Sequence, residues 1–360
     1  MKASRFAAPA LLVAAPFLFF HEIWFSGKTY LLRDLYNWFY PWRAFAADSL
    51  SRGEFPLWNP YSYAGTPFFA NMQSGLLYPP NAVFWFLDFP AAMRLFILAQ
   101  FAMAALFMHL LLRAQGCRPI SSLTGAIAYA YGGWMIVHIE FPNKLAAAAW
   151  LPLILLGLTH WWRGRTIRGL VIGAAAVCCC VTAGYPQTTF TLLLGAGLVW
   201  CGALLVAGSP RGDSVRGASL LSTLVSMPAI AGLGALIAAI QIVPFVEALS
   251  LSAARQPFEP AQVLSLGLSP WHFLDLIFPH IFGLPGYRHY MGGNLLQFWL
   301  GHFYVGGVTL CLALAGLFSR RPGVGRCAAL LVVAAVFCLG DRTPLAPFCV
   351  AWLPGFIHFK

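Results

Sequence analysis

The residue that first suggests chemistry is Asp34, in the segment YLLRDLYNWFYPWRAF at positions 30–45. The chain of 360 residues holds only 11 acidic side chains, so an acid beside Arg33 and among aromatic residues is unusual. A carboxylate in a partly apolar setting has a raised pKa and can act as a general base. The alternative is a solvated charge that pairs with Arg33 at a membrane surface.

Further polar side chains lie where apolar segments end. Lys144, next to Asn143, could bind a phosphate group as a point charge. Gln187 in the string GYPQ is either an ordinary turn residue or a residue that lines a site. Glu247 ends an apolar run, where a charge usually has a partner, and Arg255 is the candidate partner. That pair is either structural or orients a phosphate group.

Metal binding is not indicated by the spacing of the potential ligands. His138 with Glu140, and His272 with Asp275, are suitable residue types, but such turns are more often merely polar. The nine cysteines form no C-x-x-C pair and no Cys/His pattern of a zinc site. We assign no metal ligand, and the cofactor is left open, with a divalent cation as an alternative.

The composition identifies a membrane protein that crosses the bilayer several times. Hydrophobic residues make up 60% of the chain and charged residues only 9%, whereas soluble proteins carry about 25% charged residues. The net charge of +11 is spread in small groups between apolar runs, which argues against a nucleic-acid surface. The sequence predicts about nine spans, at residues 7–25, 92–112, 121–138, 145–162, 169–183, 188–207, 219–247, 296–318 and 327–339.

The distribution of charge predicts that the N-terminus is cytoplasmic. With that orientation the short inner loops hold most of the flanking arginines, and Asp213 is the one acid on the inner side. Two outer segments are long, at 26–91 and 248–295, and we expect function on the extracytoplasmic face. The expected fold is an all-α transmembrane helical bundle, with residues 1–360 forming a single transmembrane domain.

The first outer segment is expected to contain an interfacial helix. PWRAFAADSLSRG has Pro41 at the first helical position and Gly53 just past the end. Trp42 and Phe45 share one face, whereas Arg43 lies away from it, as is typical of a helix lying in the membrane interface. Asp34 is placed in a separate segment before that helix.

Several strings resemble the YfhO-like family of bacterial membrane proteins. The most specific are GEFPLWNPYSYAGTPFFANMQSGLLYPPN and QIVPFVEALSLSAAR, and FPNKLAAAAWLPL, AGYPQTTF, FPHIFG and LGDRTPLAPFCVAWLPGFIHFK match in order. Family members usually run longer, so the chain is expected to be the N-terminal portion of one, truncated at its C-terminus.

The family is similar to the GT-C group of polytopic glycosyltransferases. The resemblance implies a long first extracytoplasmic loop with interfacial helices and transfer of a sugar from a polyprenyl-phosphate carrier. It also implies a catalytic acid early in that loop, which is Asp34 here. Such a transfer needs a base for the acceptor hydroxyl and a cation or metal for the departing phosphate.

The best-matched string supplies candidate substrate-binding residues. They are Glu54, Trp58, Asn59, Gln73 and Tyr78, which could shape an acceptor or sugar pocket. The alternative is a rigid loop whose polar groups satisfy its own backbone.

The expected function is therefore that of a multi-pass glycosyltransferase of the bacterial cytoplasmic (inner) membrane. Its expected partners are membrane lipids, a lipid-linked sugar donor and a cell-envelope acceptor, and no nucleic acid. Two alternatives stay open, a transporter or flippase and a noncatalytic envelope-assembly protein. Against transport, no charged residue lies deep in a span and no inverted repeat with broken helices is evident.

Overall fold

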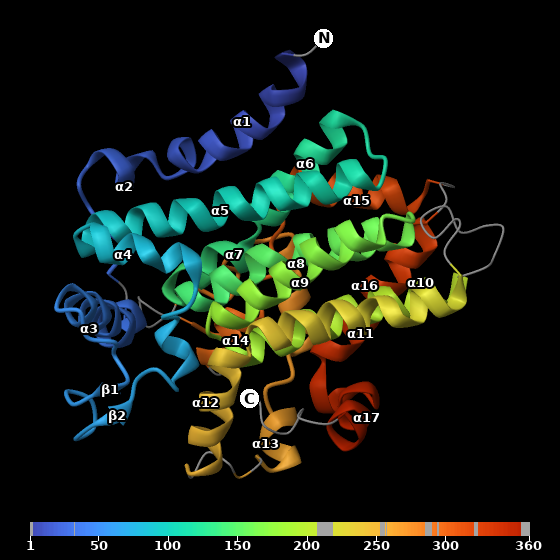
Figure 1. The fold of residues 1–360 in the computed structure, drawn as a ribbon. Helices are drawn as coiled ribbons and strands as arrows, with labels where there is room; N and C mark the ends of the chain where they lie inside the picture. The colour runs from blue at the N-terminus through green and yellow to red at the C-terminus, as the bar shows by residue number, and fades with distance from the viewer. Residues whose placement is uncertain are drawn as a thin grey trace. The chain divides into compact units, whose positions relative to one another are not determined.

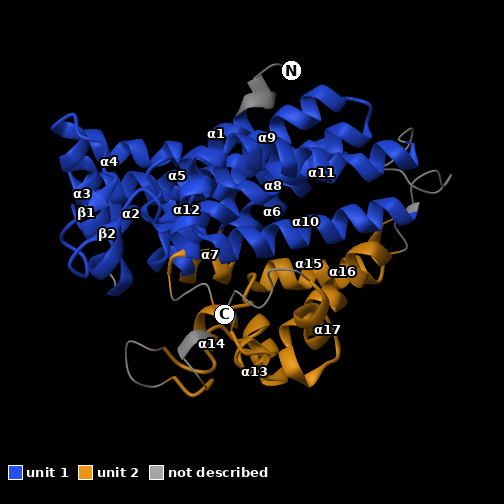
Figure 2. Ribbon diagram, turned by 60° about the horizontal axis from the view of Figure 1, so that its bottom comes forward, with its two compact units in different colours: residues 1–130, 138–250 blue, residues 131–137, 251–360 orange. Residues whose placement is uncertain are grey.

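The computed structural model describes residues 3–31, 33–206, 219–252, 256, 258–284, 290–293, 295–319 and 323–353. The chain divides into two compact units (Figure 2). Unit 1 comprises residues 1–130 and 138–250, and unit 2 comprises residues 131–137 and 251–360. Both units are built mainly of helices, and the one sheet among the described residues is a short antiparallel pair in unit 1.

Unit 1 contains the long helices and the first loop (Figure 1). Its α-helices are α1 (Ala3–Phe19), α2 (His21–Phe25), α3 (Tyr40–Ser51), α4 (Val83–Phe86), α5 (Phe89–Ala114), α6 (Pro119–Ala130), α8 (Pro142–Trp162), α9 (Thr166–Thr182), α10 (Pro186–Val206), α11 (Leu220–Ile237) and α12 (Ala239–Ser250). Its strands are β1 (Trp58–Asn59) and β2 (Thr66–Pro67), and its short 3₁₀ or π turns are η1 (Leu35–Phe39), η2 (Met72–Ser74), η3 (Pro79–Ala82) and η4 (His138–Glu140).

Helix α8 is the central helix of unit 1 and packs against α5, α9, α10 and α11. It meets α9 where glycines let the two backbones touch, since a Cβ on Gly157 would lie 2.6 Å from Cα of Gly173. It meets α11 through hydrogen bonds from the indoles of Trp161 and Trp162 to serine hydroxyls, at 3.0 and 3.1 Å. These contacts fix the helix whose first turn carries Asn143 and Lys144.

The membrane character of the chain is confirmed, and the expected number of about nine spans is not. Among the described residues, five helical segments are long and apolar enough to cross a membrane, at Phe89–Ala114, Pro119–Glu140, Pro142–Trp162, Pro186–Leu205 and Leu220–Ile237. Further apolar helices coincide with other expected spans but are shorter, such as Thr166–Thr182 and Val324–Cys338.

Four expected spans are interrupted in the structure, and the one at 121–138 has its break between Ala130 and Gly133. The span at 7–25 breaks at Phe20, where α1 gives way to α2. The span at 219–247 breaks at Ala238, and the following helix directs Gln241 Nε2 to the carbonyl of Phe69 at 2.8 Å. The span at 296–318 breaks between residues 300 and 307, where Gly306 has φ +90°.

The first loop is closed at its base and has a small core of its own. Arg94 at the start of α5 donates to the carbonyls of Gly27 and Lys28, both at 3.1 Å, so the two ends of the loop lie together. Inside it Phe68 is buried against Phe45, with ring centroids 4.9 Å apart. The loop is therefore a folded element of unit 1.

The prediction that Asp34 lies in a separate segment before the interfacial helix is wrong. The chain is helical from Arg33 to Ser51, with a π-helical turn at Leu35–Phe39 directly before Pro41. The wider π turn accommodates the missing amide hydrogen of Pro41, so the helix continues through it. The placement of Arg43 on the polar side is also wrong, because its side chain is buried and 4% exposed.

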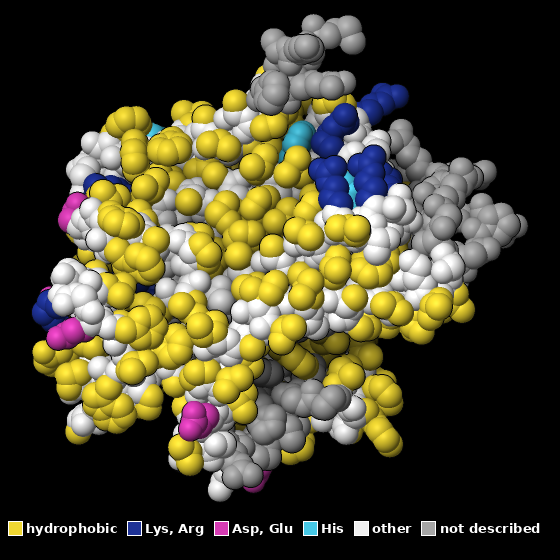
Figure 3. All heavy atoms as spheres, viewed as in Figure 1, with side chains coloured by type: hydrophobic (Ala, Val, Ile, Leu, Met, Phe, Trp, Pro, Cys, Tyr) yellow, Lys and Arg dark blue, Asp and Glu magenta, His cyan; other side chains and the backbone are white. Residues whose placement is uncertain are grey.

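Basic side chains gather at one end of the face of unit 1 in Figure 3, whereas hydrophobic side chains cover most of the rest. Arg163, in the turn between α8 and α9, donates to the carbonyl of Ala114 at the end of α5. Its neighbours Arg165 and Arg168 act electrostatically on His160 at the same end. These arginines all belong to loops that the sequence predicts to be cytoplasmic.

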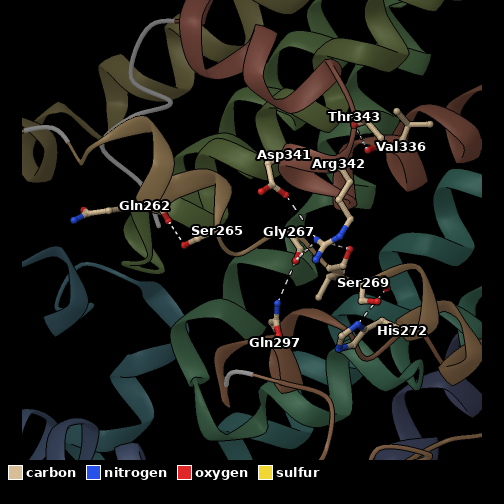
Figure 4. Close-up of polar contacts among 11 residues, drawn as sticks. Gln262, Ser265, Gly267, Ser269, His272, Gln297, Val336, Asp341, Arg342 and Thr343 are labelled. Atoms are coloured by element: carbon tan, nitrogen blue, oxygen red, sulfur yellow. Dashed lines mark hydrogen bonds and ion pairs between the residues drawn. The ribbon is translucent and has the colours of Figure 1, made fainter.

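Unit 2 contains α7 (Gly133–Val137), α13 (Pro260–Leu264), η6 (Pro270–Leu276), α14 (Leu295–Leu300), α15 (Gly307–Leu317), α16 (Val324–Cys338), η8 (Gly340–Arg342) and α17 (Leu345–Trp352). Figure 4 shows the hydrogen bonds that attach the string LGDRTP to the rest of unit 2. Nη1 of Arg342 donates to the carbonyl of Gly267 at 3.2 Å, and Nε2 of Gln297 donates to the same oxygen at 3.1 Å. The role of this string within unit 2 is thus to hold one turn of the second long loop.

Candidate functional site

Asp34 lies half-buried at the start of the π-helical turn η1. Burial raises the pKa of its carboxyl group above the ordinary 3.8, and the negative charge of Glu140 raises it further. The positive charges of Arg33 and Lys144 act in the opposite direction, but the net change of the pKa is upward. A raised pKa makes this carboxylate a better proton acceptor near neutral pH.

Glu140 is the second acid of this cluster and is 8% exposed. Its Oε1 lies 3.0 Å from Nε of Arg33, whose side chain is 54% exposed. The ion pair joins η4 to the segment that carries Asp34, although the two are far apart in the sequence. In the sequence Glu140 is recognisable only as an acid directly before the string FPNK. That position gives no indication that Arg33 is its partner.

Lys144 and Tyr185 complete the cluster. Nζ of Lys144 lies 4.8 Å from the ring centroid of Tyr185 and 4.2 Å from that of Phe141. Burial, followed by the negative charge of Asp34, raises the pKa of the Tyr185 hydroxyl. Asp34, Glu140, Lys144 and Tyr185 thus come from three separate segments and act on one another. Tyr185 was not among the expected site residues, although it lies in the string AGYPQTTF.

Asn143 connects the segments that carry the cluster. It is 1% exposed, and its Nδ2 donates to the carbonyls of Gln73, at 2.8 Å, and of Gly184, at 3.4 Å. Its Oδ1 accepts from Nη2 of Arg43 at 2.9 Å, and Nη1 of Arg43 donates to the carbonyl of Ser74. Burial lowers the pKa of Arg43 to about 9. Asn143 therefore ties the first turn of α8, which carries Lys144, to the segments of Arg43 and Gly184.

Tyr78, Gln73 and Gln187 are further residues that the sequence assigned to substrate binding. Tyr78 is 1% exposed, and its hydroxyl donates to Oε1 of Gln100 at 2.8 Å and accepts from Nε1 of Trp150 at 2.9 Å. Gln73 lies in η2, where its amide nitrogen donates to Oδ1 of Asn71 at 3.0 Å. Gln187 is half-buried in the first turn of α10. Their roles as substrate ligands stay predictions.

Glu54, Trp58 and Asn59 lie at the hairpin of β1 and β2. Glu54 is exposed, 3.5 Å from Nε of Arg52. Asn59 is buried and forms a turn of its own loop, since Oδ1 accepts from the amide of Tyr61 at 2.9 Å. The ring of Trp58 covers Gly65, where a Cβ would lie 2.6 Å from it. Their roles as substrate ligands also stay predictions.

The expected pair of Glu247 and Arg255 cannot be assessed as a pair, because Arg255 lies outside the described residues. Glu247 is exposed near the end of α12, and its carbonyl accepts from Oγ of Ser250 at 2.7 Å. Both stay predicted substrate-binding residues.

No group of three or more His, Cys, Asp or Glu side chains within the described ranges is arranged to hold a metal ion. Asp275 in unit 2 instead accepts from backbone amides, those of His280, Phe303 and Tyr304, at 3.0 to 3.2 Å. That carboxylate organises the second long loop.

Residues 4–181 match the sequence family described as bacterial membrane protein YfhO. The match contains the whole first loop, Glu140, Asn143 and Lys144, and it confirms the family resemblance. Comparison with curated proteins finds no match, and neither does comparison with solved structures.

Proposed function

We propose that this membrane protein of the YfhO family is a glycosyltransferase. It transfers a sugar from a polyprenyl-phosphate donor to a cell-envelope acceptor on the extracytoplasmic face of the bacterial inner membrane. The observation that carries the proposal is the cluster itself, a half-buried carboxylate with a raised pKa that is acted on by two cations, Arg33 and Lys144.

The cluster has the groups that the transfer needs. Asp34 takes the proton of the acceptor hydroxyl as its oxygen forms a bond to the anomeric carbon of the donor sugar. The bond from that carbon to the phosphate oxygen breaks, and the polyprenyl phosphate leaves with the electron pair. Lys144 and Arg33 stabilise the negative charge on the departing phosphate. Glu140 holds Arg33 in place through the 3.0 Å ion pair.

The depth of the cluster suits a lipid-linked donor. Glu140 ends one candidate membrane-spanning segment, Pro119–Glu140, and Lys144 lies in the first turn of the next, Pro142–Trp162. The phosphate of a lipid carrier lies at the boundary between hydrocarbon and water, which is where such helix ends lie. A transporter would place its charged groups near the middle of the membrane instead.

The experiment replaces the gene in cells that lack the native copy with the wild type or with Asp34→Asn. Asparagine keeps the size of the side chain but cannot accept the proton, so incorporation of labelled sugar into the envelope is expected to fall at least about 100-fold. Asp48→Asn is the matched control, because Asp48 is an exposed acid on α3 that pairs with Arg52. Normal incorporation with Asp34→Asn at wild-type protein levels would falsify the proposal.

A further inference from the structure

The first loop of unit 1 contains a cavity of about 250 Å³ that is separate from the Asp34 cluster in its residues. Its walls include four aromatic side chains, Trp38, Trp42, Tyr63 and Phe68, and three polar ones, Ser62, Thr66 and Asn71. Pockets for drug-sized ligands begin at about 300 Å³, so this cavity has room for about one ring. The combination of aromatic faces with a few polar groups is typical of a built ligand site.

The aromatic side chains of the helix and the hairpin stack into one wall. The rings of Trp38 and Tyr63 are nearly parallel, at 22°, with centroids 6.0 Å apart, and Trp42 lies 5.8 Å from Trp38. Tyr63 is 78% exposed and Trp38 is 37% exposed. Aromatic faces carry partial negative charge and attract the weakly positive C–H groups of a sugar ring.

The polar walls offer hydrogen-bonding groups beside these faces. Oδ1 of Asn71 accepts from the amide of Gln73, whereas its Nδ2 bonds to no side chain or backbone group in the described part of the chain. The Thr66 hydroxyl likewise makes no hydrogen bond to a described residue, and Oγ of Ser62 accepts from Nδ2 of Asn59 at 3.2 Å. An alkyl or prenyl chain would leave these groups unpaired, whereas a sugar has hydroxyls for them.

The backbone of the hairpin is strained at Tyr63. Tyr63 and Ala64 are consecutive non-glycine residues with φ of +50° and +62°, in the left-handed region that disfavours side chains. Trp58 and Asn59 stabilise this turn, through the contact with Gly65 and through the hydrogen bond to the amide of Tyr61. Strained backbone that is maintained in this way is concentrated at ligand sites.

Both sides of the cavity are connected to the Asp34 cluster within unit 1. Trp38 lies one helical turn from Asp34 on the same continuous helix, about 6 Å along its axis. On the other side, Asn71 precedes η2 by one residue, and the carbonyl of Gln73 in η2 accepts from Asn143, the neighbour of Lys144.

We propose that this cavity binds one pyranose ring of the acceptor, with the C–H face of the sugar against Trp38 and Tyr63 and its hydroxyls bonded to Thr66 and Asn71. The acceptor role rests on the proposed glycosyltransferase function. The sequence predicted that Trp58 and Asn59 of this hairpin contact the substrate. In this proposal they only shape the cavity, because neither of them lines it.

The test measures binding of methyl hexosides by saturation-transfer NMR, using the full chain in lipid nanodiscs. The wild type is expected to bind them, and Tyr63→Gly is expected to weaken binding about fivefold to tenfold, because it removes one stacking face. Tyr63→Gly also relieves the positive φ, so loss of binding will not reflect loss of folding. Ala64→Gly is the matched control, since it relieves the same kind of strain and keeps the Tyr63 ring. Trp38→Ala is a second variant, on the helix side of the same aromatic wall.

Four results would overturn the assignment. They are no binding to the wild type, unchanged binding to Tyr63→Gly and Trp38→Ala, equal binding of cyclohexanol, and binding of a hexose 1-phosphate but of no methyl hexoside. Cyclohexanol has the ring without the array of hydroxyls, and a hexose 1-phosphate resembles the donor. Binding of methyl hexosides by a protein that transfers no sugar would support the cavity and contradict the glycosyltransferase function, so the two proposals fail separately.

Discussion

Nε of Arg33 lies 3.0 Å from Oε1 of Glu140, although 107 positions separate the two residues. This ion pair brings η4 against the segment of Asp34, and Lys144 follows in the next helical turn. One cluster thereby combines two acids and two basic residues, of which Glu140 and Lys144 lie at the ends of candidate membrane-spanning segments. The predictions below test what each member contributes.

Glu140→Gln is expected to shift the pH dependence of sugar transfer. The negative charge of Glu140 raises the pKa of Asp34, so its removal lowers that pKa and moves the acidic limb of the rate profile to lower pH. The measurement is kcat/KM for transfer as a function of pH. Asp48→Asn removes an exposed acid from the same loop and is expected to leave the profile unchanged. An acidic limb at the same pH in Glu140→Gln would mean that the two carboxylates are not coupled.

Asn143→Ala is expected to destabilise the protein by about 2–4 kcal/mol, because it removes the hydrogen bonds that Asn143 makes with Nη2 of the buried Arg43 and with the carbonyls of Gln73 and Gly184. Thermal unfolding in detergent, followed by circular dichroism, measures the change. Gln115→Ala truncates an exposed amide side chain at the end of α5 and serves as the control. Equal midpoints for the two variants would contradict the structural role of Asn143.

Gly184→Ala and Gly164→Ala form a pair that separates crowding from backbone strain. Both glycines have positive φ, of +87° and +73°, so alanine is strained at either position, by about 1–2 kcal/mol. A Cβ on Gly184 would additionally lie 2.1 Å from the carbonyl oxygen of Met72, whereas a Cβ on Gly164 meets nothing within 4 Å. Sugar transfer is therefore expected to fall in Gly184→Ala, which displaces Tyr185, and to persist in Gly164→Ala. Comparable activities in the two variants would show that the contact with Met72 is unimportant.

Local patterns in the sequence predicted the helical membrane class and the position of Asp34 in the first loop. Hydropathy found the apolar helices because each reflects the composition of one segment. It missed the breaks at Phe20 and Ala238, which depend on backbone geometry within apolar runs. The continuous helix through Pro41 was missed because a π turn leaves no compositional signal.

The arrangement of the site was harder to predict because it depends on long-range partners. Helical periodicity placed Arg43 on a polar face, but the groups that satisfy it, Ser74 and Asn143, come from other segments. The pairing of Arg33 with Glu140 is likewise absent from any local window. Lys144, Asn143 and Asp34 were all selected from the sequence, and the structure brings their two segments together.

The orientation in the membrane is tested by labelling single cysteines introduced at Ser51 and Ser265, in a protein stripped of its native cysteines. Both positions are exposed, in the first and second long loops respectively. A membrane-impermeant maleimide is expected to modify both in intact spheroplasts, because the distribution of arginines predicts that these loops face outward. Modification that requires permeabilised membranes would reverse the orientation and remove the site from the extracytoplasmic face.

The most direct test of the central claim is release of polyprenyl phosphate from a polyprenyl-phosphate sugar by the purified full chain in nanodiscs with an envelope acceptor. We predict turnover by the wild type and a loss of at least about 100-fold in Asp34→Asn. The variant is also expected to be at least as stable as the wild type at neutral pH. A folded-state pKa above 3.8 means that burying the ionised carboxylate opposes folding as the pH rises past that value. Loss of turnover without loss of stability is the predicted result, and wild-type turnover by Asp34→Asn would contradict the assignment of Asp34 as the catalytic base.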